Sequence, residues 1–292
     1  MRHMNIFEKI LSYLTFEIET APESYGLYHF FMLGLIVCTA VILCVKYKDA
    51  DDKSFRRLLF ILWCVMVVGE TYHQTCFFFH NEGGVAVWEY EWYKFPFQFC
   101  AAPLYILPFA VFPKSERIRD CATAFLMSFS LFAGLAVVIY PNDVFVRLIG
   151  ATTQSMIHHG LQVVIGILIG VHNRKRLTFR FYAGGIPVFA ILISIAMALN
   201  IAGYHILQSA GMNDTFNMFY VSPYFDCTLP VLNILYPLLP YPVFLMIYIV
   251  GFTGVGALVF YLVKLFVKIG EYVQAKTSIY TRKAKKLSYV KK

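Results

Sequence analysis

The sequence has few charged residues. Only 14% of its residues are charged, whereas 59% are hydrophobic and 17% are aromatic; a soluble globular domain carries about 25% charged residues. Apolar runs of about 18 residues or more recur along most of the chain, and each is long enough to cross the roughly 30 Å hydrocarbon core of a bilayer as a helix. The composition therefore predicts a membrane protein with several transmembrane helices and no large soluble domain.

The sequence also lacks the cysteine spacing of a disulfide framework or a zinc site. Its seven cysteines include no CxxC pair, and most lie in apolar runs, where a thiol behaves as a small hydrophobic side chain. We therefore expect no metal site, and nothing in the sequence requires a cofactor. The first 25 residues contain Glu8, Glu17 and Glu19 and no uninterrupted apolar core, so no cleavable signal peptide is expected.

The apolar runs predict an all-α membrane protein, a bundle of seven transmembrane helices. The expected spans are residues 27–45, 58–80, 95–113, 120–140, 148–171, 181–207 and 242–267. Residues 5–20 alternate apolar and acidic side chains at near-helical spacing and are too polar to span, so they are predicted to lie on the membrane surface. The expected domains are an interfacial segment at 1–26, a transmembrane domain at 27–267 and a basic tail at 268–292.

Positive charges are distributed unevenly between the connections. Taken alternately along the chain, one set of connections holds 21 of the 25 Lys and Arg residues and the other set holds 4. By the positive-inside rule the first set is cytoplasmic, which places the N-terminus outside and the C-terminus in the cytoplasm. The net charge of +8 then reflects orientation, so we expect no nucleic-acid partner, and the tail TRKAKKLSYVKK is predicted to bind anionic lipid headgroups.

A few polar side chains interrupt the apolar runs. Because buried polar groups are costly in lipid, each is a functional hypothesis. The sets are Glu70, His73 and Gln74 in the second span, Gln154, Ser155, His158, His159 and Gln162 in the fifth, and Asn200, Tyr204, His205 and Gln208 in the sixth. The expected topology puts all three sets in the outer half of the membrane, which predicts a shared cavity covered by the connection 208–241.

The third predicted span, FPFQFCAAPLYILPFAVFP, contains four prolines. Pro103 cannot donate a hydrogen bond to the carbonyl of Phe99, so a helix is expected to be distorted beside Cys100. Pro96 suits the first helical position and would place Cys100 just beyond the first turn. There the positive end of the helix dipole favours a thiolate.

A cysteine near the amino end of one helix and a histidine on a facing helix are the parts of a nucleophile and base pair. Within a bilayer the natural substrate is an acyl chain carrying an ester. Gln98 or a glutamine of the fifth span is a candidate donor to an oxyanion. The polar set is also compatible with a transporter or receptor in which Glu70, the histidines and Asn200 line a cavity, and with a structural or assembly protein.

Three motifs carry a resemblance to a known family: FPFQFCAAP, MIHHGLQ and FNMFYVSPYFDCTLP. They resemble the YwaF-like family of bacterial integral membrane proteins, which includes the animal acyltransferase called transmembrane protein 164. The resemblance covers most of residues 27–265. A more distant likeness connects the group to the androgen-induced membrane hydrolases, which use Thr and His on fatty-acid esters.

The resemblance implies that Cys100 is the nucleophile and His158 the general base. If the helix faces differently, we expect His159 to be the substitute base. The resemblance also implies that the site is shaped by Asn217, Tyr220, Ser222 and Pro223. Gln98 stands where a histidine commonly precedes the cysteine by two residues in this family. The implied activity is the transfer of a fatty acyl chain between phospholipids or lysolipids, in a multi-pass protein of the bacterial cell membrane.

Overall fold

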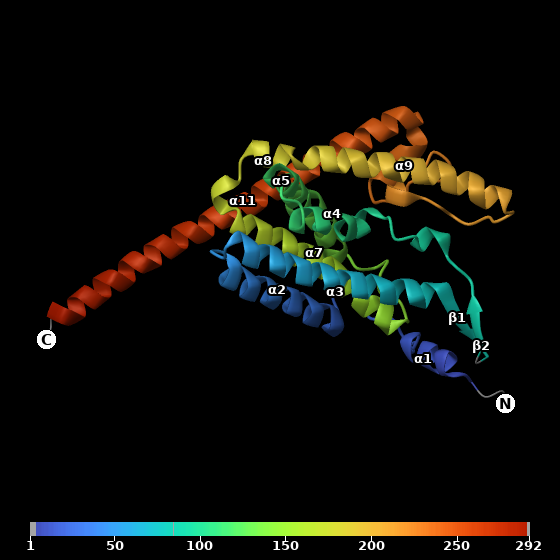
Figure 1. Ribbon diagram of the computed structural model, residues 1–292, viewed down its shortest axis with the longest axis horizontal. Helices are drawn as coiled ribbons and strands as arrows, with labels where there is room; N and C mark the ends of the chain where they lie inside the picture. Colours follow the sequence, from blue (N-terminus) through green and yellow to red (C-terminus); the bar gives the residue numbers. More distant parts are fainter. Residues whose placement is uncertain (1–3, 84, 291–292) are drawn as a thin grey trace.

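The computed structural model describes residues 4–83 and 85–290, and most of them are helical. The helices form an elongated bundle from which the last helix extends well beyond the others (Figure 1). Among the described residues, six helical stretches are long and apolar enough to cross a membrane: Leu27–Tyr47, Trp92–Val111, Glu116–Ile139, Ile149–His172, Phe179–Ser209 and Tyr241–Thr277. The chain is therefore a multi-pass membrane protein, and six of the seven predicted spans coincide with these stretches.

The second predicted span, 58–80, falls within helix α3, Asp52–Phe78. This helix starts at Asp51, whose side chain accepts a hydrogen bond from the backbone N–H of Ser54, as is usual at a helix N-terminus. Its polar residues keep it out of the set of six strongly apolar stretches. It nevertheless packs in the bundle, against α4 (Ala102–Val111) and α7 (Ile149–His172).

One end of the bundle carries the N-terminal segment and a hairpin. Helix α1, Ile6–Leu14, starts with a capping box between Asn5 and Glu8, so part of the predicted surface segment is helical. It contacts an antiparallel pair, β1 (Phe79–Glu82) and β2 (Val85–Trp88). These elements lie together in Figure 1, on the side away from the C-terminus.

The third predicted span is not one continuous helix. It contains the 3-10 turn η2 (Phe99–Ala101) and α4, Ala102–Val111, and a further 3-10 turn, η1 (Trp92–Lys94), precedes it. The expectation that Pro96 begins the helix is wrong, because the backbone at Gln98 is extended (φ −75°, ψ 162°) and helical structure begins only at Phe99. Pro103 instead occupies the first turn of α4, where its missing N–H costs no helical hydrogen bond.

The fourth span is α5 (Glu116–Phe125), a π-helical turn η3 (Leu126–Ser130) and α6 (Leu131–Ile139). It packs closely on α7 at the centre of the bundle. A Cβ atom at Gly134 would lie 2.7 Å from Gln162 Cβ, so only glycine allows α6 and α7 to approach this closely at that point.

Helix α8 (Phe179–Ala183) leads into α9 (Gly185–Ser209), and an irregular connection follows. That connection holds η5 (Met218–Tyr220), α10 (Leu232–Leu235) and η6 (Tyr236–Leu238). The last helix, α11, runs from Tyr241 to Val290 without a break. The predicted basic tail is therefore helical as far as residue 290, and its last two residues, 291–292, lie outside the described part of the chain.

The connections rich in Lys and Arg meet at one end of the bundle. Arg174 pairs with Asp49 and, at 3.4 Å, with Glu271, and Arg176 pairs with Asp120. The Arg174 guanidinium holds the pKa of the Asp49 carboxyl below its usual value. Ion pairs thus join the four segments that the charge count assigns to one side of the membrane.

Candidate active site at Cys100

Cys100 and His158 lie next to each other in the folded chain. The carbonyl oxygen of Cys100 is 3.0 Å from His158 Nε2 and accepts a second hydrogen bond, of 2.8 Å, from Gln162 Nε2. His158 and Gln162 are four residues apart on α7 and therefore share one helical face. Pro103 has no N–H to offer this carbonyl in a continuing 3-10 helix, so the two side chains of α7 satisfy it instead.

The contact with the carbonyl fixes the tautomer of His158. A carbonyl oxygen only accepts hydrogen bonds, so Nε2 carries the proton and Nδ1 keeps its lone pair. His158 Nδ1 is buried and has no hydrogen-bond partner among the described residues. A buried polar atom without a partner is unusual in a folded protein, and this one keeps a lone pair that can accept a proton.

His159 faces a different direction. Its Nδ1 lies 2.7 Å from the carbonyl oxygen of Ser155 on its own helix, and it has no described contact with Cys100. The ring centroids of His158 and His159 are 5.4 Å apart. Of the two neighbouring histidines, His158 is therefore the one that contacts the candidate nucleophile.

The thiol of Cys100 lies in a mixed polar environment. It interacts electrostatically with Glu70 and Lys94 and lies against the backbone N–H of Ala101, and Tyr220 interacts with it from the connection after α9. Within the described residues no hydrogen bond joins the thiol to His158, so the two residues meet through the Cys100 carbonyl. Lys94 was missed by the sequence analysis, although it is the one basic residue in the predicted outer connection 81–94.

Glu70, His73 and Gln74 form the predicted polar face of α3. Gln74 Nε2 donates to Glu70 Oε1 at 2.7 Å and to the carbonyl oxygen of Lys94 at 2.9 Å, and Tyr90 donates to Gln74 Oε1. His73 Nδ1 lies 3.7 Å from Glu70 Oε1. This network ties α3 to the segment that leads into Cys100.

The backbone at Phe219 and Tyr220 is strained. Both residues have positive φ, 58° and 56°, in the left-handed region that bulky side chains rarely adopt. Such a conformation persists only where the surroundings hold it in place. Here it fixes the position of Tyr220 in the connection after α9.

Three side chains from distant elements, and one directly before the turn, hold this strained backbone. Gln98 accepts a hydrogen bond from the N–H of Phe219 at 3.0 Å and donates to the carbonyl of Asn217 at 3.1 Å. Asn200, fully buried on α9, bonds both the N–H and the carbonyl of Met218. The remaining two contacts come from Asn217, which accepts from the N–H of Ser222, and from Tyr248, which donates to the carbonyl of Phe219.

The other predicted polar residues lie away from Cys100. Gln154 is buried between α7 and α3, within 3.7 Å of the place of a Cβ at Gly69. Tyr204 stacks on Tyr224 with ring centroids 3.9 Å apart, and Gln208 is exposed. The polar face predicted for the sixth span is therefore divided, and only Asn200 supports the turn beside Cys100.

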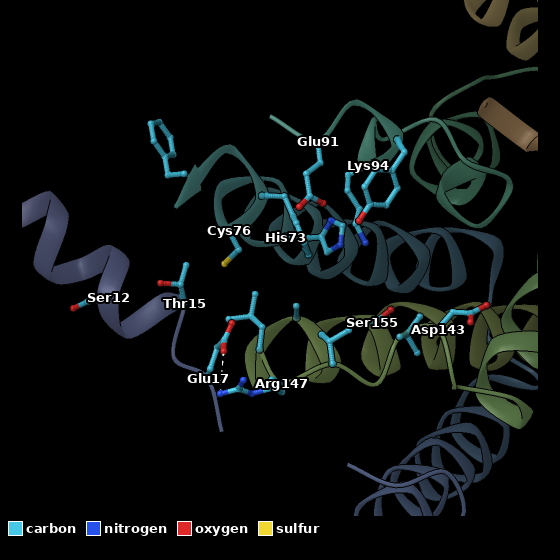
Figure 2. Close-up of a pocket in the computed structure, with 17 residues that line it drawn as sticks. Ser12, Thr15, Glu17, His73, Cys76, Glu91, Lys94, Asp143, Arg147 and Ser155 are labelled. Carbon is cyan, nitrogen blue, oxygen red and sulfur yellow. Dashed lines mark ion pairs between the residues drawn. The ribbon is translucent and has the colours of Figure 1, made fainter. Parts of the chain in front are cut away.

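Two cavities adjoin this region. The polar cavity, about 630 Å³, lies between α3, α7 and the segment around Lys94; Figure 2 shows its polar lining, which comprises Ser12, Thr15, Glu17, His73, Glu91, Lys94, Asp143, Arg147 and Ser155. The apolar groove, about 820 Å³, lies between α3 and α4 and includes Trp63, Val67, Glu70, Gln74, Leu104 and Phe109. Neither is lined by Cys100 or His158. Glu70 lines the apolar groove and Lys94 lines the polar cavity.

Comparison with known proteins identifies a family. The model of the TMEM164 family matches residues 24–264, which is most of the chain. No match was found among curated proteins or among solved structures. Across residues 4–83 and 85–290, no group of three or more His, Cys, Asp and Glu residues is arranged to hold a metal ion.

Proposed function

The chain belongs to the TMEM164 family, and from that premise we propose that it is a membrane-embedded lipid acyltransferase that works through a thioester at Cys100. The observation that carries the proposal is the contact between His158 Nε2 and the Cys100 carbonyl at 3.0 Å. It brings an imidazole with a free, buried Nδ1 to the candidate nucleophile. The proposed substrates are membrane phospholipids and lysolipids.

In the first step the Cys100 sulfur attacks the carbonyl carbon of a phospholipid ester. The S–C bond forms while the thiol proton moves to His158 Nδ1. The bond between that carbon and the glycerol oxygen then breaks, and the leaving oxygen takes the proton from His158. A lysolipid departs and the acyl chain remains on Cys100.

In the second step a hydroxyl group attacks the thioester. His158 Nδ1 takes the hydroxyl proton as the new C–O bond forms. The C–S bond breaks, and the proton returns to the sulfur. A lysolipid acceptor makes the protein a transferase, whereas water makes it a hydrolase.

The remaining polar residues act in this scheme as positioning residues. Gln98, Asn200 and Asn217 hold the strained turn that presents Tyr220. Gln162 donates a hydrogen bond to the Cys100 carbonyl. Glu70, paired with His73, provides a negative charge on α3. Gln154 and His159 support α7.

The proposal extends to topology and location. We propose seven transmembrane helices, with α3 as the seventh, the N-terminus outside and the C-terminus in the cytoplasm. The supporting observation is that the basic connections meet at one end of the bundle. The membrane proposed is the bacterial cell membrane, with the surface segment 1–26 outside and the tail 268–292 on anionic lipid headgroups.

Intact-mass measurement of the purified protein tests the proposed intermediate. Incubation with mixed phospholipids is expected to add one acyl mass to the wild-type protein, removable by hydroxylamine. Cys100→Ser is expected to lose both the labile adduct and acyl exchange, whereas Cys227→Ser, at a buried cysteine, is expected to keep both. Full acyl exchange by Cys100→Ser would overturn the mechanism. Substrate-dependent proton uptake abolished by Glu70→Gln, without any adduct, would establish the transporter alternative instead.

A further inference from the structure

One wall of the polar cavity carries three titratable side chains whose polar atoms are only partly satisfied: His73 Nδ1 has no contact closer than the 3.7 Å to Glu70. Glu91, His73 and Lys94 converge on this wall (Figure 2). Glu91 Oε2 and His73 Nδ1 are both buried and have no hydrogen-bond partner among the described residues. Buried polar atoms are nearly always satisfied in native proteins, by protein, water or a ligand. Two such atoms on one wall indicate that the cavity is built for a polar occupant.

Lys94 is the free cation of this cavity. Its ammonium lies 4.6 Å from the ring centroid of Phe77 and 4.7 Å from that of Tyr93, so cation–π contacts hold it in place. Among the described residues it forms no ion pair. Arg147, across the cavity, is already paired with Glu17 at 3.4 Å and donates to the carbonyl of Ile18. An anionic group entering the cavity therefore meets Lys94.

A simple anion fits this cavity poorly. The lining holds two permanently charged cations, Lys94 and Arg147, and three carboxylates, Glu17, Glu91 and Asp143. Once Glu17 and Arg147 are paired, one cation and two carboxylates remain. A ligand that carries one negative and one positive group satisfies this arrangement better than a ligand of one sign.

We propose that the polar cavity binds a zwitterionic phosphodiester headgroup, with the phosphate at Lys94 and the amine between Glu91 and Asp143. This deepens the proposed function and rests on it for the headgroup's role as part of the substrate. The volume of about 630 Å³ lies within the range of about 300–1,000 Å³ that is usual for small-molecule sites. Lys94 precedes Cys100 by six residues, in the segment that leads into η2, so we place the glycerol esters of a lipid held at Lys94 toward the thiol.

The test measures binding without turnover. The full-length Cys100→Ser protein in detergent is titrated calorimetrically with short-chain phosphatidylethanolamine, short-chain phosphatidylglycerol and glycerophosphoethanolamine. We expect Lys94→Gln to weaken binding of both lipids by about tenfold or more, because a hydrogen bond to a charged group is lost. Lys94→Arg is expected to restore the affinity. Glu91→Gln is expected to weaken binding of the phosphatidylethanolamine alone.

Lys276→Gln is the matched control. Lys276 also lies over an aromatic ring, 4.7 Å from the centroid of Tyr272, but outside the cavity, and its substitution is expected to leave all affinities unchanged. Equal affinities in wild type, Lys94→Gln and Glu91→Gln would overturn the proposal. Binding of glycerophosphoethanolamine as tight as that of the lipid would identify a soluble phosphodiester as the source of the group, whereas weaker binding supports a membrane lipid.

The two proposals fail separately. Loss of headgroup affinity in Lys94→Gln, with no acyl adduct on Cys100 in the wild type, keeps the headgroup site and removes the acyltransferase mechanism. An acyl adduct that forms at the same rate and for the same lipids in Lys94→Gln keeps the mechanism and removes the headgroup site.

Discussion

His158 and His159 are neighbours on α7 but make different contacts. Adjacent residues on an α-helix point about 100° apart. His158 therefore reaches Cys100 on another segment, whereas His159 bonds the carbonyl of Ser155 one turn earlier on its own helix. Of the two, only His158 contacts Cys100.

This difference predicts different effects of the same substitution. His158→Gln is expected to slow acylation of Cys100 by about 100-fold or more, the usual cost of losing a general base, while His159→Gln keeps the wild-type rate. Stopped time courses read by intact mass give both rates, and near-ultraviolet circular dichroism checks that each variant keeps its tertiary packing. A slow His159→Gln beside a normal His158→Gln would exchange the two assignments.

The element that supports the site is the turn Met218–Tyr220. Its left-handed residues are unfavourable on their own, and side chains from three other parts of the chain compensate by bonding its backbone. Gln98 lies 119 residues away from Asn217 in the sequence, and Asn200 lies 18 residues before Met218. The conformation of the turn therefore depends on how the helices pack, and the residues of the turn do not favour it by themselves.

We expect Asn200→Leu to release this turn. The substitution leaves both the N–H and the carbonyl of Met218 without a partner, at a cost of about 1–3 kcal/mol for a buried unsatisfied group. Differential scanning fluorimetry is expected to report a lower unfolding temperature, and acyl exchange is expected to fall with it. Gln208→Leu, an exposed position on the same helix, serves as the control. Equal stability of the two variants would contradict the role assigned to Asn200.

At the scale of the whole molecule, the two ends of the bundle differ in charge. Ion pairs of Arg174 and Arg176 join the basic connections at one end. The other end carries α1, the β1–β2 hairpin and the polar cavity (Figure 1). In a cell the basic end is expected to face the cytoplasm, which places the polar cavity at the outer side of the membrane.

Labelling of single cysteines tests this orientation. In a background with all seven native cysteines replaced, Asn142→Cys is expected to react with a membrane-impermeant maleimide in intact cells. Glu271→Cys, at the basic end, is expected to react only after permeabilisation. The opposite pattern would invert the proposed topology. Labelling of both positions in intact cells would show that they lie on the same side, which contradicts an odd number of spans between residues 142 and 271.

The sequence by itself determined the membrane class, the approximate extent of the helices and the short set of polar residues worth testing. These features follow from the hydrophobicity and length of each segment, which are properties of that segment alone. The proline pattern also predicted the distortion beside Cys100, although it misplaced the start of the helix at Pro96, because the extended Gln98 delays the helix and its side chain bonds a distant turn.

Only the tertiary structure decided which of these residues meet. It selected His158 over His159, used Gln98 to hold the backbone of a distant turn and brought Lys94 and Glu91 together on one wall of a cavity. The physical reason is that such contacts depend on the rotation and axial position of each packed helix. A rotation of about 100°, equivalent to one residue, would exchange the residue facing Cys100 while leaving the hydrophobic pattern of the sequence almost unchanged.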